Sequence, residues 1–238
     1  MIDFKNVVKY YQGQSHQMEA VEKLQRRIAK EHPEWLEDFA AQWRSNPPRE
    51  PQPKSPPAQL SLEVPYLSQR DNWCNPHGSC NVTSVAMTLA ALGCPTHVKG
   101  EQLEDVLYRY MSDTGLDRHS PDHLAILIRE VGVKPGLRFT ALRFEDDYTS
   151  KGTWQDAIEA LATGYPCIVH GWFTRFGHIM VIKGYTEQGW IANDPYGVWD
   201  GYQGYSAQSG ESVEYGNDEM EYACGPNGTM WLHRVRLA

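Results

Sequence analysis

The chain has 238 residues, a formal net charge of -8 and 41% hydrophobic residues, including eight tryptophans. Its length and apolar content suffice for a domain with a substantial buried core, and its acidic balance argues against nucleic acid as the main partner. No apolar run approaches the roughly 18 residues of a membrane span, and the N-terminus lacks the features of a secretory signal. We therefore expect cytoplasmic synthesis and no membrane span.

Residues 1–46 are predicted to form a small helical module. Apolar side chains recur there at helical spacing, namely Met18, Val21, Leu24 and Ile28, and then Trp35, Leu36, Phe39 and Trp43 after Pro33. A module of this size has little core of its own, so it either docks on the rest of the chain or binds another molecule. Residues 47–59 contain six prolines and are expected to be an extended linker. This places a domain boundary before a main domain at residues 60–238.

The main domain begins with the stretch that organises the rest. Val64–Leu67 predicts a short edge strand, and residues 71–79 are rich in turn-forming residues. Apolar side chains then recur at helical spacing at Val82, Val85, Ala86, Leu89 and Leu92, and Gly93 provides a helix stop. Cys80 is therefore expected at or just before the first turn of a buried helix.

A cysteine at a helix N-terminus is a candidate nucleophile. The unpaired N–H groups and the positive dipole end of the helix stabilise the thiolate and lower the thiol pKa. The alternative is that Cys80 is only a small buried hydrophobic residue.

Metal ligation by this stretch also has to be considered. Cys74, His77 and Cys80 have ligand-like spacing, but a structural zinc site usually requires four ligands from paired motifs. We therefore expect no metal or organic cofactor. The chain has five cysteines, so at least one is unpaired, and a cytoplasmic protein keeps its thiols reduced. This expectation covers Cys74, Cys94, Cys167 and Cys224 as well as Cys80.

The following segments alternate between helix and strand signals. Helices are predicted over residues 99–112, from Pro121 to Val131 after a Ser120 cap, and from a Thr153 cap to Leu161; strands are predicted over residues 137–142, 167–173, from His178, from Trp190 and over 229–237. His170 lies inside one apolar strand and is interpreted as a satisfied core histidine. Residues 198–228 are expected to form a long loop beside the substrate cleft. Helices first and an antiparallel sheet later indicate an α+β fold.

Two residues downstream can assist a thiolate. His178 begins one apolar strand, and Asp194 ends the next. If these strands pair as a hairpin, both side chains lie near one end of the sheet, where Asp194 can orient the imidazole. Either residue alone could be solvated or structural, but a cysteine, a histidine and an aspartate together are typical of nucleophilic thiol catalysis.

Four segments carry a family resemblance: VPYLSQRDN, GSCNVTSVAM, GHIMVIKGY and NDPYG. Together they resemble the C39-like cysteine peptidases of papain-type fold, over roughly residues 60–238. The resemblance implies N-terminal helices packed near a C-terminal antiparallel sheet. It also implies that Cys80 is the nucleophile, His178 the general base, Asp194 the orienting residue and Gln69 an oxyanion-hole donor. One departure is that many relatives follow the cysteine with Gly-Pro, where this chain has Asn81-Val82.

The expected function is therefore a cysteine peptidase or amidase. A single catalytic domain joined by a linker to a helical module resembles a phage endolysin, which would cleave peptidoglycan peptides in the cell wall after its release. Two alternatives stay open. One is processing of a leader or another peptide, as exporter-attached C39 peptidases do, and the other is a catalytically silent module that binds peptides.

Overall fold

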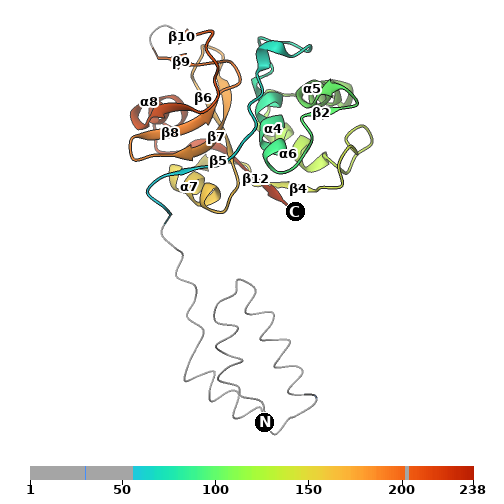
Figure 1. The fold of residues 1–238 in the computed structure, drawn as a ribbon, viewed down its shortest axis with the longest axis horizontal. Coiled ribbons are helices and arrows are strands. Elements are labelled where there is room, and N and C mark those ends of the chain that lie inside the picture. The colour runs from blue at the N-terminus through green and yellow to red at the C-terminus, as the bar shows by residue number, and fades with distance from the viewer. Residues whose placement is uncertain (1–29, 31–55, 202–203) are drawn as a thin grey trace. The chain divides into compact units, whose positions relative to one another are not determined.

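The computed structural model describes residue 30, residues 56–201 and residues 204–238 (Figure 1). Apart from residue 30, the helical module predicted at residues 1–46 lies outside the described residues, as does most of the linker at 47–59, so both stay predictions. Within the described part of the chain, no helix is both long enough and apolar enough to cross a membrane.

Three helices form one side of the domain (Figure 1). They are α4 (Cys80–Ala91), α5 (Leu103–Thr114) and α6 (Pro121–Glu130). Residues 81–89 of α4 are all buried, which makes α4 the central helix of this side. The predicted start of α6 is confirmed, because the Ser120 side chain accepts a hydrogen bond from the His123 backbone N–H.

An antiparallel sheet forms the other side, with the strand order β11-β8-β7-β6-β12-β4. These strands are β4 (Phe144–Asp146), β6 (Cys167–Gly171), β7 (His178–Tyr185), β8 (Gly189–Asn193), β11 (Val213–Gly216) and β12 (Met230–Leu237). Two further strands, β1 (Leu60–Ser61) and β5 (Thr149–Gly152), pair with β7 and β12. The remaining short elements are η2 (Gln69–Asp71), β2 (His97–Val98), β3 (Glu101–Gln102), β9 (Trp199–Asp200) and β10 (Gly204–Tyr205).

Side chains of the sheet alternate between two cores, as the pleat requires. In β7, Ile179 and Val181 belong to the core that contains α4, α5 and α6. Met180 and Ile182 belong to the opposite core, with α7 (Trp154–Ala162) and α8 (Asn217–Cys224). The sheet therefore has helices on both faces. The predicted α+β order, with helices preceding an antiparallel sheet, is confirmed.

Two predicted strands are wrong. Residues 64–67 belong to no strand, and pairing occurs earlier, at β1. Pro65 has no N–H to give to a ladder, and the Val64 carbonyl instead accepts a hydrogen bond from the Asn193 side chain at 3.0 Å. Residues 137–142 form turns, because the Leu137 N–H and C=O bond to Lys134 and Gly132. The strand follows at β4.

The loop expected at residues 198–228 is also wrong in part. It contains β9, β10, β11 and α8. The helix α8 buries only Met220 and Ala223, so its apolar periodicity is too short to recognise. The final strand, β12, was expected to close the sheet, yet it lies inside the sheet between β6 and β4.

Candidate active site

Cys80 is the first residue of α4, and the loop before it is held by buried polar contacts. The Asn72 side-chain amide forms hydrogen bonds with the Ser79 hydroxyl at 2.8 Å and the Thr83 hydroxyl at 2.9 Å. The Asp105 carboxylate, on α5, accepts hydrogen bonds from the backbone N–H groups of Trp73 and Cys74 at 3.0 and 2.7 Å. These contacts fix the approach to the helix and therefore the position of the thiol.

The residues with zinc-like spacing do not converge. The His77 Nδ1 atom lies 3.3 Å from the Tyr196 hydroxyl, whereas the Cys74 backbone N–H donates to the Asp105 carboxylate. Within the described ranges, no three His, Cys, Asp or Glu side chains come together in a way that would hold a metal ion.

His178 and Asp194 lie at the same end of the β7–β8 hairpin. His178 is the first residue of β7, Asp194 follows the last residue of β8, and the two strands pair antiparallel. The His178 Nε2 atom lies 2.7 Å from the Asp194 Oδ1 atom, and both side chains are buried. Because Nε2 is engaged by the carboxylate, Nδ1 is the ring nitrogen left for the thiol of Cys80.

The Asp194 carboxylate accepts three further hydrogen bonds that the sequence did not suggest. Its Oδ1 atom accepts from the Tyr196 backbone N–H at 2.9 Å. Its Oδ2 atom accepts from the hydroxyls of Tyr205 at 3.0 Å and Tyr215 at 3.1 Å. Burial and the Asp194 charge both raise the pKa of the two phenols, so both remain donors. The only sequence signal for these tyrosines was the Tyr-rich composition of residues 198–228, which does not indicate the residue that they contact.

Cys80 and His178 form an electrostatic pair. Burial of the thiol opposes its ionisation, but the adjacent His178, through its charge and a hydrogen bond, lowers the pKa of Cys80 overall. Burial alone would lower the pKa of His178, but Asp194 and Cys80 together raise the pKa to about 10. The arrangement therefore favours a thiolate beside an imidazolium, which is the reactive form of a nucleophilic cysteine.

The other four cysteines lie in the opposite electrostatic environment. Burial raises the pKa of Cys94 to about 11 and that of Cys167 to about 12. Burial also raises the pKa of Cys224, and burial followed by the Asp105 charge raises that of Cys74. No disulfide links any of the five cysteines. Cys80 alone among them combines a lowered pKa with a histidine partner.

Gln69 connects the two sides of the site. Its backbone N–H donates to the Pro195 carbonyl at 2.9 Å, immediately after Asp194. Its buried side chain donates from Nε2 to the Pro76 carbonyl at 3.1 Å. An amide nitrogen has two hydrogens, so one N–H remains for another acceptor, and Gln69 lines the same cavity as Cys80.

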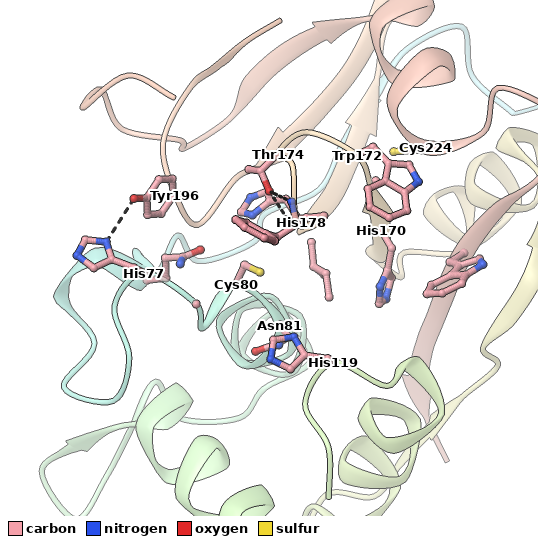
Figure 2. Close-up of a pocket in the computed structure, with 17 residues that line it drawn as sticks. His77, Cys80, Asn81, His119, His170, Trp172, Thr174, His178, Tyr196 and Cys224 are labelled. Atoms are coloured by element: carbon pink, nitrogen blue, oxygen red, sulfur yellow. Dashed lines mark hydrogen bonds between the residues drawn. The ribbon is translucent and has the colours of Figure 1, made fainter. Parts of the chain in front are cut away.

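A cavity of about 470 Å³ joins these residues (Figure 2). Its helical side includes Gln69, His77, Cys80, Asn81 and His119, and its sheet side includes His170, Trp172, Phe176, His178 and Trp231. Phe176 is 90% exposed and Trp172 is 73% exposed, so both rings are available to an incoming ligand. The Asn81 side chain lines the cavity while its Nδ2 atom donates to the Arg118 carbonyl at 2.8 Å, so the departure from Gly-Pro alters this wall.

Residues 61–218 match the model of a family described as "Peptidase_C39 like family". No curated protein sequence matches the chain significantly. Among solved structures, one similar chain is a double glycine motif protease from an AMS/PCAT transporter, in complex with the leader peptide. It has 18% identity and a TM-score of 0.44, covering 74% of this chain and 92% of that chain. Another is a C39-like peptidase from Bacillus anthracis, with 16% identity and a TM-score of 0.47, covering 75% and 98%.

Proposed function

The chain belongs to the Peptidase_C39 like family and has its α+β, papain-like fold, and from this we propose that it is a cysteine peptidase with Cys80 as the nucleophile. One observation carries the proposal. The Cys80 thiol at the start of α4 is hydrogen-bonded to His178, whose Nε2 atom is 2.7 Å from the buried Asp194 carboxylate. A nucleophile, a base and an orienting group in contact are the parts that acyl transfer through a thiol requires.

In this mechanism the Cys80 sulfur attacks the carbonyl carbon of a peptide bond. The C–N bond then breaks, and His178 donates its proton to the leaving amine. The remaining thioester is hydrolysed by water, which gives a proton to His178, and the Cys80 thiolate leaves. Asp194 keeps the His178 ring oriented throughout and stabilises its charged form.

The oxyanion formed in each step needs hydrogen-bond donors. We assign this role to the free N–H of the Gln69 amide and to the Cys80 backbone N–H at the helix terminus. The Pro76 carbonyl holds the Gln69 amide by its other hydrogen, so the donor is oriented before the substrate arrives. Preorganised donors of this kind cost little reorganisation during the reaction.

For the substrate, we propose a peptide that enters the cavity in an extended form. The family itself favours processing of peptides, including leader peptides, as exporter-attached C39 peptidases perform it. Cleavage of peptidoglycan peptides was expected from the N-terminal module and linker, which lie outside the described residues. Peptidoglycan therefore stays the second candidate, without support from the site.

Comparison of wild type with Cys80→Ser tests the reaction class. A proteome-derived peptide library, analysed by mass spectrometry, should show discrete cleavage sites with wild type and less than a few per cent of that activity with the serine variant. Both proteins should melt at nearly the same temperature, because the swap is almost isosteric. Substantial activity of the serine variant would contradict the nucleophile assignment.

A thiol-reactive probe separates an enzyme from a silent binding module. Iodoacetamide at neutral pH should label Cys80 first, because the other four cysteines have raised pKa values. Uniform labelling of all five would indicate an unactivated thiol and favour the binding module. Parallel assays on a double-glycine leader peptide and on purified peptidoglycan then separate the two substrate classes.

A further inference from the structure

A second chain of polar side chains crosses the sheet outside the catalytic group. His233, on β12, places its Nδ1 atom 2.6 Å from the Asp146 Oδ2 atom, on β4. The His233 Nε2 atom lies 3.0 Å from the Nε2 atom of His170, on β6. The three residues therefore form a continuous chain over neighbouring strands. His233 and Asp146 are buried, whereas His170 reaches the cavity beside Cys80 (Figure 2).

Hydrogen-bond chemistry allows two proton arrangements along this chain. The Asp146 carboxylate accepts from Nδ1 of His233 in both. In the first arrangement the His233 Nε2 atom carries a lone pair, and the His170 Nε2 atom donates into it. In the second, His233 is protonated on both nitrogens and donates from Nε2, which leaves the His170 proton on Nδ1. Burial, and then the neighbouring His233, hold the pKa of His170 well below its ordinary value of 6.5. His170 is therefore a neutral ring, and its Nδ1 atom is an acceptor in the first arrangement and a donor in the second.

The Nδ1 atom of His170 is the part of the ring that the protein leaves unpaired. It forms no hydrogen bond with any residue in the described part of the chain, although His170 lines the cavity. The Trp231 ring contacts His170 edge-on, with the ring centroids 5.7 Å apart. Gly171, the next residue, is the register partner of His178 across the β6–β7 pair. His170 therefore lies one residue from the strand position opposite the proposed base.

We propose that the first arrangement holds and that His170 is a substrate-binding residue whose Nδ1 atom accepts a hydrogen bond from a main-chain N–H of the bound peptide. This inference rests on the proposed peptidase function. Asp146 and His233 are positioning residues, since they act only by holding the His170 ring and its proton. The interpretation of His170 as a satisfied core histidine holds in part. One ring nitrogen contacts His233, but the ring also forms part of the cavity wall.

An ester scan of the substrate tests the inference. The peptide that wild type cleaves fastest in the library is resynthesised with each N–H flanking the cleaved bond replaced, one at a time, by an ester oxygen. Wild type should lose about tenfold in kcat/KM at one position, the expected cost of one hydrogen bond. His170→Phe should lose about tenfold on the all-amide peptide and show no further loss at that position.

His119→Phe is the matched control, because His119 also lines the cavity but lies on the helical side, outside the chain of histidines. It should keep the tenfold ester effect. Equal ester effects in wild type and His170→Phe, or no sensitive position in wild type, would overturn the assignment to His170. If wild type cleaves no peptide in the library, the proposed function itself fails and the inference falls with it.

Nitrogen-15 NMR of the full chain labelled at histidine tests the proton arrangement without any substrate. The His170 signals are assigned by their loss in His170→Phe. At neutral pH, Nδ1 of His170 should show the shift of an unprotonated ring nitrogen and Nε2 that of a protonated one. The reverse pattern would make Nδ1 a donor and would overturn the proposed acceptor role.

Discussion

The sheet contains two buried histidine–aspartate pairs, and their surroundings differ. In one pair His178 contacts Asp194 at 2.7 Å, and in the other His233 contacts Asp146 at 2.6 Å. The Asp194 carboxylate accepts four hydrogen bonds from described residues. The Asp146 carboxylate accepts one, from His233, and its Oδ1 atom is buried without a partner among the described residues.

The comparison shows that the pair alone does not define a role. What differs chemically is the partner of the second ring nitrogen, which is a thiol for His178 and another histidine for His233. The two aspartate carboxylates also differ in the hydrogen bonds that remain if the histidine is lost: Asp194 keeps three from described residues, and Asp146 keeps none. We therefore expect loss of His178 to affect catalysis, and loss of His233 to affect stability.

The largest expected effect is on the rate. His178→Ala removes the general base and acid, so kcat/KM should fall by about 10²- to 10⁴-fold. Its free energy of unfolding should change by only about 1 kcal/mol, because Asp194 keeps three donors. Peptide cleavage and urea unfolding of the same preparation measure both quantities. A large loss of stability would mean that the two pairs do not differ as argued.

The second prediction concerns stability. His233→Ala leaves the buried Asp146 carboxylate unpaired, so unfolding should become easier by about 3–5 kcal/mol. The double variant His233→Ala/Asp146→Leu removes both partners and should recover part of that loss, since the cost lies in the uncompensated charge. If the double variant is no more stable than the single one in urea unfolding, the unpaired carboxylate is not the cause.

The third prediction uses pH to read the thiol beside the first pair. The pKa of Cys80 is lowered and that of His178 is raised to about 10, so the thiolate and the protonated ring coexist between the two values. Iodoacetamide labelling of Cys80 should therefore rise less steeply with pH between about pH 7 and 9 than labelling of an ordinary thiol, which gains about tenfold per pH unit below its pKa. Peptide cleavage should fall above about pH 10, as His178 loses its proton. A labelling rate that rises tenfold per unit would contradict the ion pair.

The sequence predicted the first pair but missed the second, and the reason is distance along the chain. The α4 helix with Cys80 at its start, and the hairpin that joins His178 to Asp194, follow from periodicity within short segments. Asp146 and His233 are 87 residues apart, and no local pattern joins them. Both lie on strands whose neighbours are decided only when the whole sheet assembles.

The further hydrogen-bond donors to Asp194 could not be predicted from local sequence patterns, for a related reason. Tyr205 and Tyr215 donate to Asp194 from a region expected to be loop, because its strands are short and α8 has only two buried apolar residues. The predicted strand at residues 137–142 has suitable residues, but turns use its backbone groups first. In these segments tertiary packing outweighs local propensity.

The smallest expected effect on kcat/KM comes from Asp194→Asn, which removes the negative charge of the side chain and keeps its shape. In Asp194→Asn the amide oxygen can still accept from His178, and the amide nitrogen can donate to the Tyr205 and Tyr215 hydroxyls, which can also act as acceptors. A neutral acceptor is weaker than a charged one by about 1–1.5 kcal/mol, so kcat/KM should fall only about tenfold. Because the Asp194 charge raises the pKa of His178, the alkaline loss of cleavage should move to lower pH. Asp146→Asn, the matched control, should leave that alkaline limb in place. A loss as complete as that of His178→Ala, or an unmoved limb, would show that Asp194 does not act through the His178 ring.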